Sequence, residues 1–218
     1  SKLEGISQSS DRNIRIVYTP LHGVGATSIV PALRNLGYDD LHLVHSQTTP
    51  DGNFPTIPGG LANPEDPNTL TLAIQDASKV DADLVIASDP DADRLGCAFP
   101  LPGKGWDAAA EELALNGNQI GAILCHYLLR QRKCNGSLPK HGVVCETIVT
   151  SDLTGSIARS FGVEVIDNLL VGFKYIAEVI ENLPADAHFL FGTEESHGYL
   201  ADSFVRDKDA ASAAILLC

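Results

Sequence analysis

Short apolar runs alternate with amphipathic segments along the first half of the chain. The apolar runs predict strands and the amphipathic segments predict helices, with strands expected at 13–18, 41–45 and 82–88 and helices at 26–36 and 70–80. Strands that alternate with helices are typical of an α/β domain with a largely parallel sheet. The stretch 47–68 is rich in Pro, Gly, Asn and Thr, and a loop of this length inside a compact domain is usually functional.

The second half of the chain repeats this style. Strands are expected at 143–149, 163–170 and 188–191, and helices at 118–133, 152–161, 173–183 and from Lys208 onward. The segment P-L-P-G-K-G-W at 100–106 interrupts the pattern and is the best candidate for a boundary. We therefore predict two consecutive α/β domains, residues 1–105 and residues 106–218, with a loose polar stretch over residues 1–12.

The hexapeptide D-P-D-A-D-R at 89–94 follows the last apolar run of the first half. Asp89, Asp91 and Asp93 alternate, and alternate residues of an extended segment share one face. Three converging carboxylates repel one another unless a cation sits among them, and a hard divalent cation, Mg²⁺ first, is the natural occupant. Arg94 adds a fixed positive charge that suits a phosphate. The sequence therefore predicts a metal site with a phosphate nearby.

Other interpretations of this hexapeptide are open at this point. An acidic surface turn is one of them. An EF-hand loop is excluded because Arg94 stands where its glycine is required and Pro100 where its glutamate is required. An aspartyl-nucleophile phosphatase, in which Asp89 would be phosphorylated and Asp91 would act as acid and base, is the stronger rival. Asp93 weighs against it, because those enzymes use Thr or Val at this position.

Three other loops follow predicted strands, and ligands of open α/β sheets bind beyond the carboxyl ends of strands. The first of these loops, T-P-L-H-G-V-G at 19–25, is predicted to be a tight turn. It either places His22 near a ligand or has a structural role alone. A dinucleotide-binding fingerprint is disfavoured, because Ser28 stands where its third glycine would be. Lys174 lies in the first turn of its predicted helix, where a cation opposes the helix dipole. A residue that breaks a local rule suggests function, although a solvated lysine is the simpler alternative.

The third loop, G-T-E-E-S-H-G-Y at 192–199, contains a carboxylate beside a hydroxyl. Glu194 and Ser196 would point the same way in an extended loop, which suits the vicinal hydroxyls of a sugar. A metal site built from Glu194, Glu195 and His197 is the weaker alternative, because this spacing matches no standard site.

Composition limits the partners of the protein. The chain has 218 residues and a net charge of −13, which argues against nucleic acid or an anionic membrane. Neither a membrane-spanning run nor a signal peptide is visible. The five cysteines contain no C-x-x-C pair, so we expect reduced thiols in a cytoplasmic protein. The absence of Met suggests that methionines were dropped from the sequence, and the uncapped end suggests a chain cut from something longer.

Taken together, the loops resemble those of the α-D-phosphohexomutase superfamily, the phosphoglucomutase/phosphomannomutase enzymes. The matching motifs occur in the family's order and cover nearly the whole chain: T-P-L-H-G-V-G at 19–25, A-N-P-E at 62–65, D-P-D-A-D-R at 89–94, L-N-G-N-Q-I-G at 115–121, V-G-F-K-Y at 171–175, G-T-E-E-S-H-G-Y at 192–199 and R-D-K-D at 206–209. The resemblance implies four domains, of which this chain is similar to the second and third. Both would be three-layer α/β domains with mixed, largely parallel sheets.

The resemblance also implies a reaction and a set of site residues. A phosphoserine would donate its phosphoryl group to a sugar monophosphate, and the sugar 1,6-bisphosphate would turn over and return its other phosphate. Mg²⁺ would neutralise the charge of the transferring group. The implied metal ligands are Asp89, Asp91 and Asp93; the implied catalytic residues are Arg94 and Lys174, the latter as general base; the implied substrate contacts are Glu194, Ser196, Gly172, Phe173 and His22.

Some expectations concern what the motifs leave out. The T-A-S-H-N-P-like segment of the family's first domain and the R-x-S-G-T phosphate clamp of its fourth are not found here. We therefore expect no mutase activity from residues 1–218 alone, and a non-catalytic sugar-phosphate-binding module is a second rival. Thr193 stands where many members have Gly, so the sugar stays open, with glucose or mannose phosphate favoured over pentose or amino-sugar phosphates.

Overall fold

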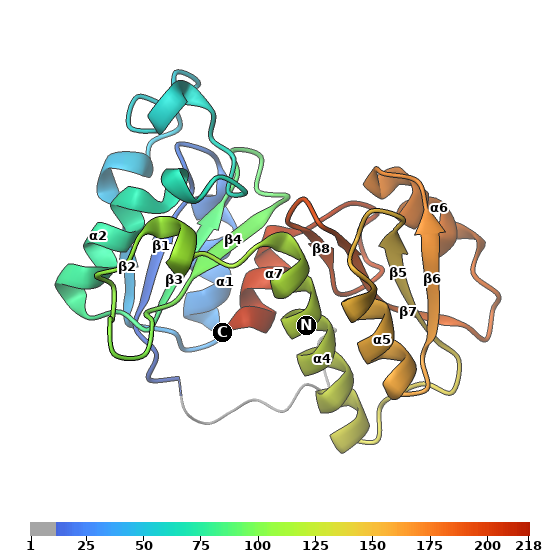
Figure 1. Cartoon of the computed structure of the whole chain (residues 1–218). Helices are drawn as coiled ribbons and strands as arrows, with labels where there is room; N and C mark the ends of the chain where they lie inside the picture. The colour runs from blue at the N-terminus through green and yellow to red at the C-terminus, as the bar shows by residue number, and fades with distance from the viewer. Residues whose placement is uncertain (1–11) are drawn as a thin grey trace. The chain divides into compact units, whose positions relative to one another are not determined.

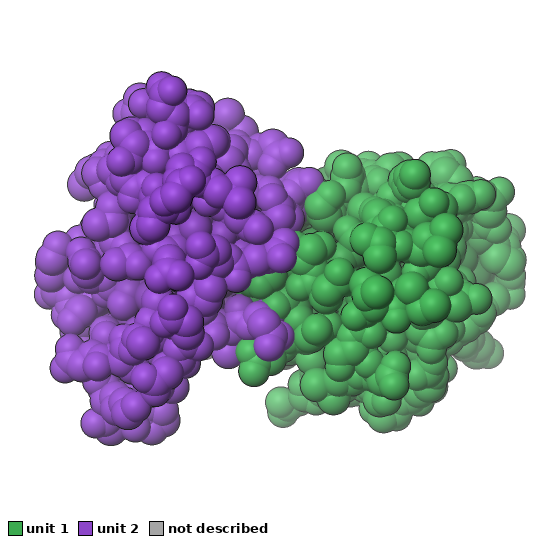
Figure 2. All heavy atoms as spheres, turned by 45° about the horizontal axis from the view of Figure 1, so that its top comes forward, with its two compact units in different colours: residues 1–10, 117–217 green, residues 11–116, 218 purple. Residues whose placement is uncertain are grey.

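A computed structural model describes residues 12–218, which form two compact units, residues 12–116 and residues 117–217. We call them the N-terminal unit (purple in Figure 2) and the C-terminal unit (green). The polar stretch expected to be loose lies, up to residue 11, outside the described residues. The units divide later than the predicted boundary at residue 105 because Trp106 and Leu113 belong to the N-terminal core, where the Trp106 indole donates to the Ala82 carbonyl at 2.8 Å.

The N-terminal unit is built on a four-stranded sheet in the order β2-β1-β3-β4 (Figure 1). Its strands are β1 (Ile16–Thr19), β2 (Leu41–Leu43), β3 (Leu84–Ser88) and β4 (Leu95–Ala98), and its helices are α1 (Ile29–Asn35), α2 (Thr71–Val80) and α3 (Ala110–Leu113). Short 3-10 turns cover Gly25–Thr27, His45–Gln47, Pro58–Gly60 and Pro67–Leu70. Only β4 runs antiparallel to its neighbour.

The residues of β1, β3 and β4 are buried on both faces of the sheet, which is why these strands read as continuous apolar runs. Val17, Val85 and Ala87 pack in one core cluster with Ala73 and Ala77 of α2. The alternating positions, such as Tyr18 and Ile86, are also fully buried and lie on the opposite face. The sheet therefore forms the middle layer of the unit.

The C-terminal unit repeats this plan with the sheet order β6-β5-β7-β8. Its strands are β5 (Gly142–Thr147), β6 (Glu164–Leu169), β7 (His188–Glu194) and β8 (Gly198–Leu200), and its helices are α4 (Gly117–Cys134), α5 (Asp152–Ser160), α6 (Phe173–Asn182) and α7 (Ala210–Leu217). Val143 and Cys145 pack against α6, whereas Glu146, one position on, lies near Gly155 of α5. Two mixed, largely parallel sheets with helices confirm the predicted fold class.

The two antiparallel strands, β4 and β8, were not expected from the sequence. Each is short and pairs with the strand just before it, so each makes a hairpin: β3 with β4 and β7 with β8. The Asp89–Arg94 segment and the Glu195–His197 segment are therefore hairpin turns, and Glu194 is the last residue of β7 rather than a loop residue. None of the helices in the described part of the chain is long and apolar enough to cross a membrane.

Candidate functional site

The three aspartates of the β3–β4 turn lie together. Asp89, Asp91 and Asp93 each place a carboxylate oxygen within 4.8 Å of the others. The backbone route differs from the predicted extended segment, because the Asp89 backbone carbonyl accepts from the Ala92 N–H at 3.1 Å and Ala92 has a left-handed φ of 62°. A tight turn, with strain of the kind that clusters at functional sites, brings the carboxylates to one point.

Asp89 is the buried member of the group, with only 2% of its surface exposed. Its Oδ1 accepts from the backbone N–H groups of Asp93 and Arg94, both at 3.0 Å, and its Oδ2 accepts from Arg94 Nε at 2.9 Å. Burial raises the pKa of Asp89 to about 6 despite these donors, and Asp93 adds to the rise. The turn is thus a site where a carboxylate is held out of water beside the Arg94 guanidinium.

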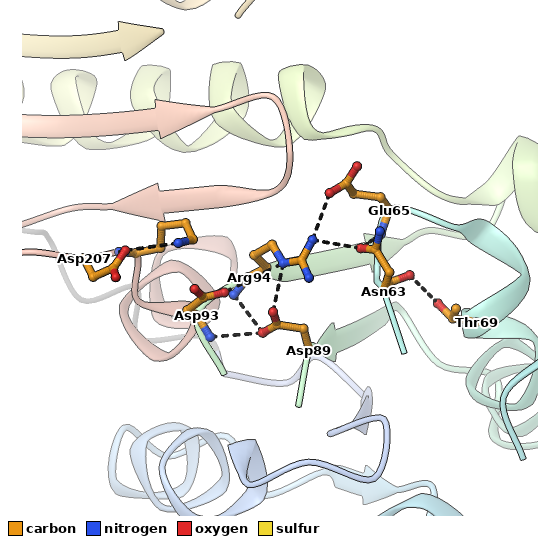
Figure 3. Close-up of polar contacts among 8 residues, drawn as sticks. Asn63, Glu65, Thr69, Asp89, Asp93, Arg94 and Asp207 are labelled. Atoms are coloured by element: carbon orange, nitrogen blue, oxygen red, sulfur yellow. Dashed lines mark hydrogen bonds and ion pairs between the residues drawn. The ribbon is translucent and has the colours of Figure 1, made fainter. Parts of the chain in front are cut away.

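Arg94 is fixed by two segments that lie far apart in the sequence (Figure 3). Its Nη1 donates to Asn63 Oδ1 at 3.1 Å and to Glu65 Oε1 at 3.0 Å, while Nε donates to Asp89. The A-N-P-E segment packs closely on β4, because a Cβ on Gly96 would meet the Pro64 side chain at 2.8 Å. The long loop at 47–68 therefore supplies part of the site, as its length suggested.

The loop at 19–25 supports the aspartate turn from the other side. Val24 N–H donates to the Pro90 carbonyl at 2.9 Å, and a Cβ on Gly23 would lie 2.2 Å from Pro90 Cα. Only glycine lets the two backbones approach this closely. His22, predicted to contact substrate, is buried and places its ring nitrogens 3.3 Å from the Thr49 carbonyl and 2.9 Å from Thr56 Oγ1. The structure thus gives His22 a role in ordering the long loop.

In the C-terminal unit, Glu194 and Gly172 are joined. The Gly172 N–H, at the start of α6, donates to Glu194 Oε1 at 2.8 Å, and Gly172 has a φ of 121° that favours glycine. Burial raises the pKa of Glu194, while the Gly172 hydrogen bond and Lys208 oppose the rise. Ser196 lies half-buried in the adjoining turn. The two loops predicted to bind substrate therefore meet at one carboxylate.

The neighbouring Glu195 is held by a pair of hydroxyls. Thr147 is the last residue of β5, and Thr150 lies in the turn that follows. Each places Oγ1 3.3 Å from Glu195 Oε2, and the two hydroxyls lie 2.9 Å apart. The start of α4 presses on the same turn, because a Cβ on Gly117 would lie 1.8 Å from the Glu195 carbonyl oxygen. The L-N-G-N-Q-I-G motif thus shapes the hairpin turn that carries Ser196.

Lys174 and Phe173 face different surroundings. Lys174 is exposed in the first turn of α6, with Nζ 5.0 Å from the centre of the Tyr175 ring. Phe173 is buried in the core of the C-terminal unit, and Lys208 Nζ lies 5.7 Å from the centre of its ring. Phe173 therefore offers a ligand little more than its backbone, whereas the Lys174 amine is accessible.

The aspartate turn fits a divalent metal by its donor set. Three carboxylates converge, all available ligand atoms are oxygens, and the site combines burial with an excess of negative charge. These are the ligands that Mg²⁺ and similar hard cations prefer. Within the described residues, no other group of three or more such ligands lies together.

Sequence reasoning named the A-N-P-E motif but gave Asn63 and Glu65 no role. It also missed the Thr147 and Thr150 hydroxyls, which lie about 45 residues from Glu195 along the chain. The motif, placed in a long loop, was the available signal for the first pair. No local pattern marks the second pair.

Comparison with known proteins agrees with the two units. Residues 2–102 match the family model described as phosphoglucomutase/phosphomannomutase, alpha/beta/alpha domain II, and residues 116–218 match that of domain III. Curated phosphoglucomutases of Staphylococcus aureus and Staphylococcus haemolyticus are 40% identical over 205 residues, 94% of this chain and 35% of theirs. The chain therefore spans about a third of the length of these relatives.

Solved structures share the fold at low sequence identity. A Thermus thermophilus protein assigned as a phosphomannomutase superposes with a TM-score of 0.71 at 22% identity, over 99% of this chain and 42% of that one. A phosphoglucomutase/phosphomannomutase family protein from Burkholderia thailandensis gives a TM-score of 0.65 at 18% identity, over 94% and 38%. Both place the fold of this chain among known α/β structures.

Proposed function

Because the chain belongs to the phosphoglucomutase/phosphomannomutase family, we propose that it supplies the metal-binding and sugar-binding elements of a phosphohexomutase. The proposed reaction is Mg²⁺-dependent transfer of a phosphoryl group between the 1- and 6-positions of a hexose phosphate, through a phosphoserine and a sugar 1,6-bisphosphate. The observation that carries the proposal is the convergence of Asp89, Asp91 and Asp93 beside Arg94.

In the N-terminal unit, the proposed task is to stabilise negative charge. Asp89, Asp91 and Asp93 would hold Mg²⁺, which when bound neutralises charge on the transferring group. Arg94 donates hydrogen bonds from a guanidinium whose position is set by protein contacts on two of its nitrogens. A planar guanidinium held in this way matches the geometry of phosphoryl oxygens.

In the C-terminal unit, the proposed tasks are sugar binding and proton transfer. Glu194 uses Oε1 to accept from Gly172, which leaves Oε2 to accept from a sugar hydroxyl. The Ser196 hydroxyl serves a neighbouring sugar oxygen as donor or acceptor. Lys174, exposed at the start of α6, takes the proton from the accepting hydroxyl as general base.

Binding of a metal and a sugar bisphosphate tests this proposal. The chain is titrated by calorimetry with Mn²⁺, and then with glucose 1,6-bisphosphate at saturating Mg²⁺. We expect Asp91→Asn to weaken Mn²⁺ binding by at least about tenfold, because one of three charged ligands is lost, and Glu194→Gln to weaken sugar binding alone. Asp76→Asn, which removes the carboxylate of a surface ion pair with Lys79, is the control. Metal affinity that is indifferent to Asp91→Asn contradicts the proposal.

Turnover is a separate matter. The family resemblance puts the phosphoryl-carrying serine on another domain, so we propose that residues 1–218 by themselves bind these ligands without converting glucose 1-phosphate to glucose 6-phosphate. A coupled assay for glucose 6-phosphate on the purified chain checks this, and measurable conversion sinks the idea. The aspartyl-nucleophile alternative gains no support, because Asp89 is 2% exposed and both its carboxylate oxygens accept hydrogen bonds.

A further inference from the structure

The guanidinium of Arg94 has a free edge with a defined direction. Nε is engaged by Asp89, and Nη1 by Asn63 and Glu65. A guanidinium has five N–H donors, and among the described residues nothing accepts from the two on Nη2. These two donors share one edge of a rigid plane, so the three acceptors on the other atoms decide where that edge points (Figure 3).

Of the acceptors, the Glu65 carboxylate has no other structural task. The segment around it is held by different groups: Asn63 Oδ1 accepts from the Glu65 N–H at 3.1 Å, and the Thr69 hydroxyl donates to the Asn63 carbonyl at 3.2 Å. Pro64 is seated against Gly96 of β4. Among the described residues, Arg94 is the partner with which the Glu65 carboxylate forms a hydrogen bond and an ion pair.

A third carboxylate beside Arg94 needs an explanation. Asp89 already pairs with the guanidinium, and Asp93 Oδ1 lies 3.8 Å from its Nε. Adding Glu65 increases the repulsion that a phosphate would meet at this place. Electrostatics alone therefore disfavours a carboxylate at position 65. Glu65 Oε1 accepts from Arg94 Nη1 at 3.0 Å, and Asn63 Oδ1 accepts from the same nitrogen. The two acceptors together occupy both N–H groups of Nη1 and prevent the guanidinium plane from turning.

We propose that Glu65 is a positioning residue that, with Asn63, presents the Nη2 edge of Arg94 to a phosphoryl group. This rests on the proposed function in naming the phosphoryl group as the partner of Arg94. The contacts of Asn63 and Glu65 with Arg94, which we call the Arg94 clamp, are present in the ligand-free protein and can be measured without any ligand. Removing Glu65 should let the guanidinium turn, so that binding a phosphate first requires its orientation to be restored.

The experiment compares Glu65→Ala with Glu65→Gln, because glutamine keeps the acceptor and removes the charge. Glu112→Ala, which removes the carboxylate of an exposed ion pair with Lys104 in the same unit, is the control. Glucose 1,6-bisphosphate is titrated into each variant of the full chain at saturating Mg²⁺. We expect Glu65→Ala to lose about fivefold in affinity, the size of one charge-assisted hydrogen bond that is partly exposed, with Glu65→Gln and Glu112→Ala within about twofold of the unaltered chain.

Nitrogen-15 NMR of the arginine side chains gives the ligand-free readout, with the Arg94 signal identified by its loss in Arg94→Lys. Rotation about the Nε–Cζ bond should be faster in Glu65→Ala and close to normal in Glu65→Gln. Equal rotation rates in all variants overturn the proposal, as does tighter sugar binding by both Glu65 variants, which would make Glu65 a source of repulsion only. If the unaltered chain binds no sugar bisphosphate, the proposed function fails and the NMR rates alone decide on the clamp.

Discussion

Replacing Gly23 by alanine should push the aspartate turn out of place. The added Cβ would lie 2.2 Å from Pro90 Cα and 2.4 Å from the Pro90 carbonyl oxygen. Carbon atoms in contact lie about 3.5 Å apart or more, so the two backbones must separate by roughly 1 Å. Both partners are backbone, and neither can rotate away as the end of a side chain could.

The cost of this substitution can be set out in three parts. Overpacking costs about 1–3 kcal/mol, and loss of the hydrogen bond from Val24 N–H to the Pro90 carbonyl costs about 1 kcal/mol more. Alanine reduces the freedom of the unfolded chain, which returns about 0.4–1 kcal/mol. The free energy of unfolding of the N-terminal unit should therefore fall by about 2 kcal/mol.

Trp106 makes the assay specific, because it is the only tryptophan of the chain and is 7% exposed in the N-terminal core. Urea unfolding followed by its fluorescence should show a midpoint lower by about 1 M in Gly23→Ala, given the usual slopes of about 1–3 kcal/mol/M. Gly52→Ala is the matched control, since a Cβ there meets nothing within 4 Å and its φ is not in the left-handed region. Equal midpoints for the two variants would refute the close approach of the two loops.

Three further outcomes are expected. Burial raises the pKa of Glu146 from 4.5 to about 7, and the charge of Asp167 adds to the rise. The folded state therefore binds this proton more tightly than the unfolded state does. As a result, the stability of the C-terminal unit should fall as pH rises from about 4.5 to about 7. Glu146→Gln should flatten that slope in urea titrations between these two pH values, and an unchanged slope would assign it to other groups. Thr150→Val should release Glu195 and weaken glucose 1,6-bisphosphate binding about threefold without lowering the melting temperature by more than a few degrees; undiminished affinity would show that the hydroxyl pair does not act on the turn. Gly117→Ala should weaken sugar binding more than Thr150→Val does, because its Cβ would lie 1.8 Å from a backbone oxygen, and calorimetry on both variants ranks them.

The chemistry of the aspartate turn could be predicted because it is local. Three carboxylates within five positions and an arginine next to them restrict what the segment can do, whatever its backbone path. The backbone path of residues 89–94 was wrongly predicted as extended. The reason is that β4 (Leu95–Ala98) has no alternation of apolar and polar residues that would indicate a hairpin. Short strands of this kind form because they pair with a neighbouring strand, here β3, and their own residues do not predict that pairing.

Contacts between distant segments could not be predicted from the sequence for a different reason. Glu65 and Arg94 are 29 residues apart, and their meeting depends on how the long loop packs against β4. In the same way, the P-L-P-G-K-G-W segment resembles a linker in the sequence, whereas the compact N-terminal unit extends to residue 116 because Trp106 anchors this segment in its core. Gly23 and Gly117 both belong to motifs of the sequence, but the structure is needed to show that the Pro90 backbone packs against the first and the Glu195 backbone against the second.

We propose above that Asp89, Asp91 and Asp93 together bind a divalent cation. Crystals of the chain soaked in Mn²⁺ and measured with anomalous scattering test it most directly. We expect one anomalous peak at the β3–β4 turn, at about 2.0–2.6 Å from an oxygen of each aspartate, the range found for hard divalent cations. A well-diffracting soaked crystal with no peak at this turn, or with a peak that touches fewer than two of the three carboxylates, would contradict it.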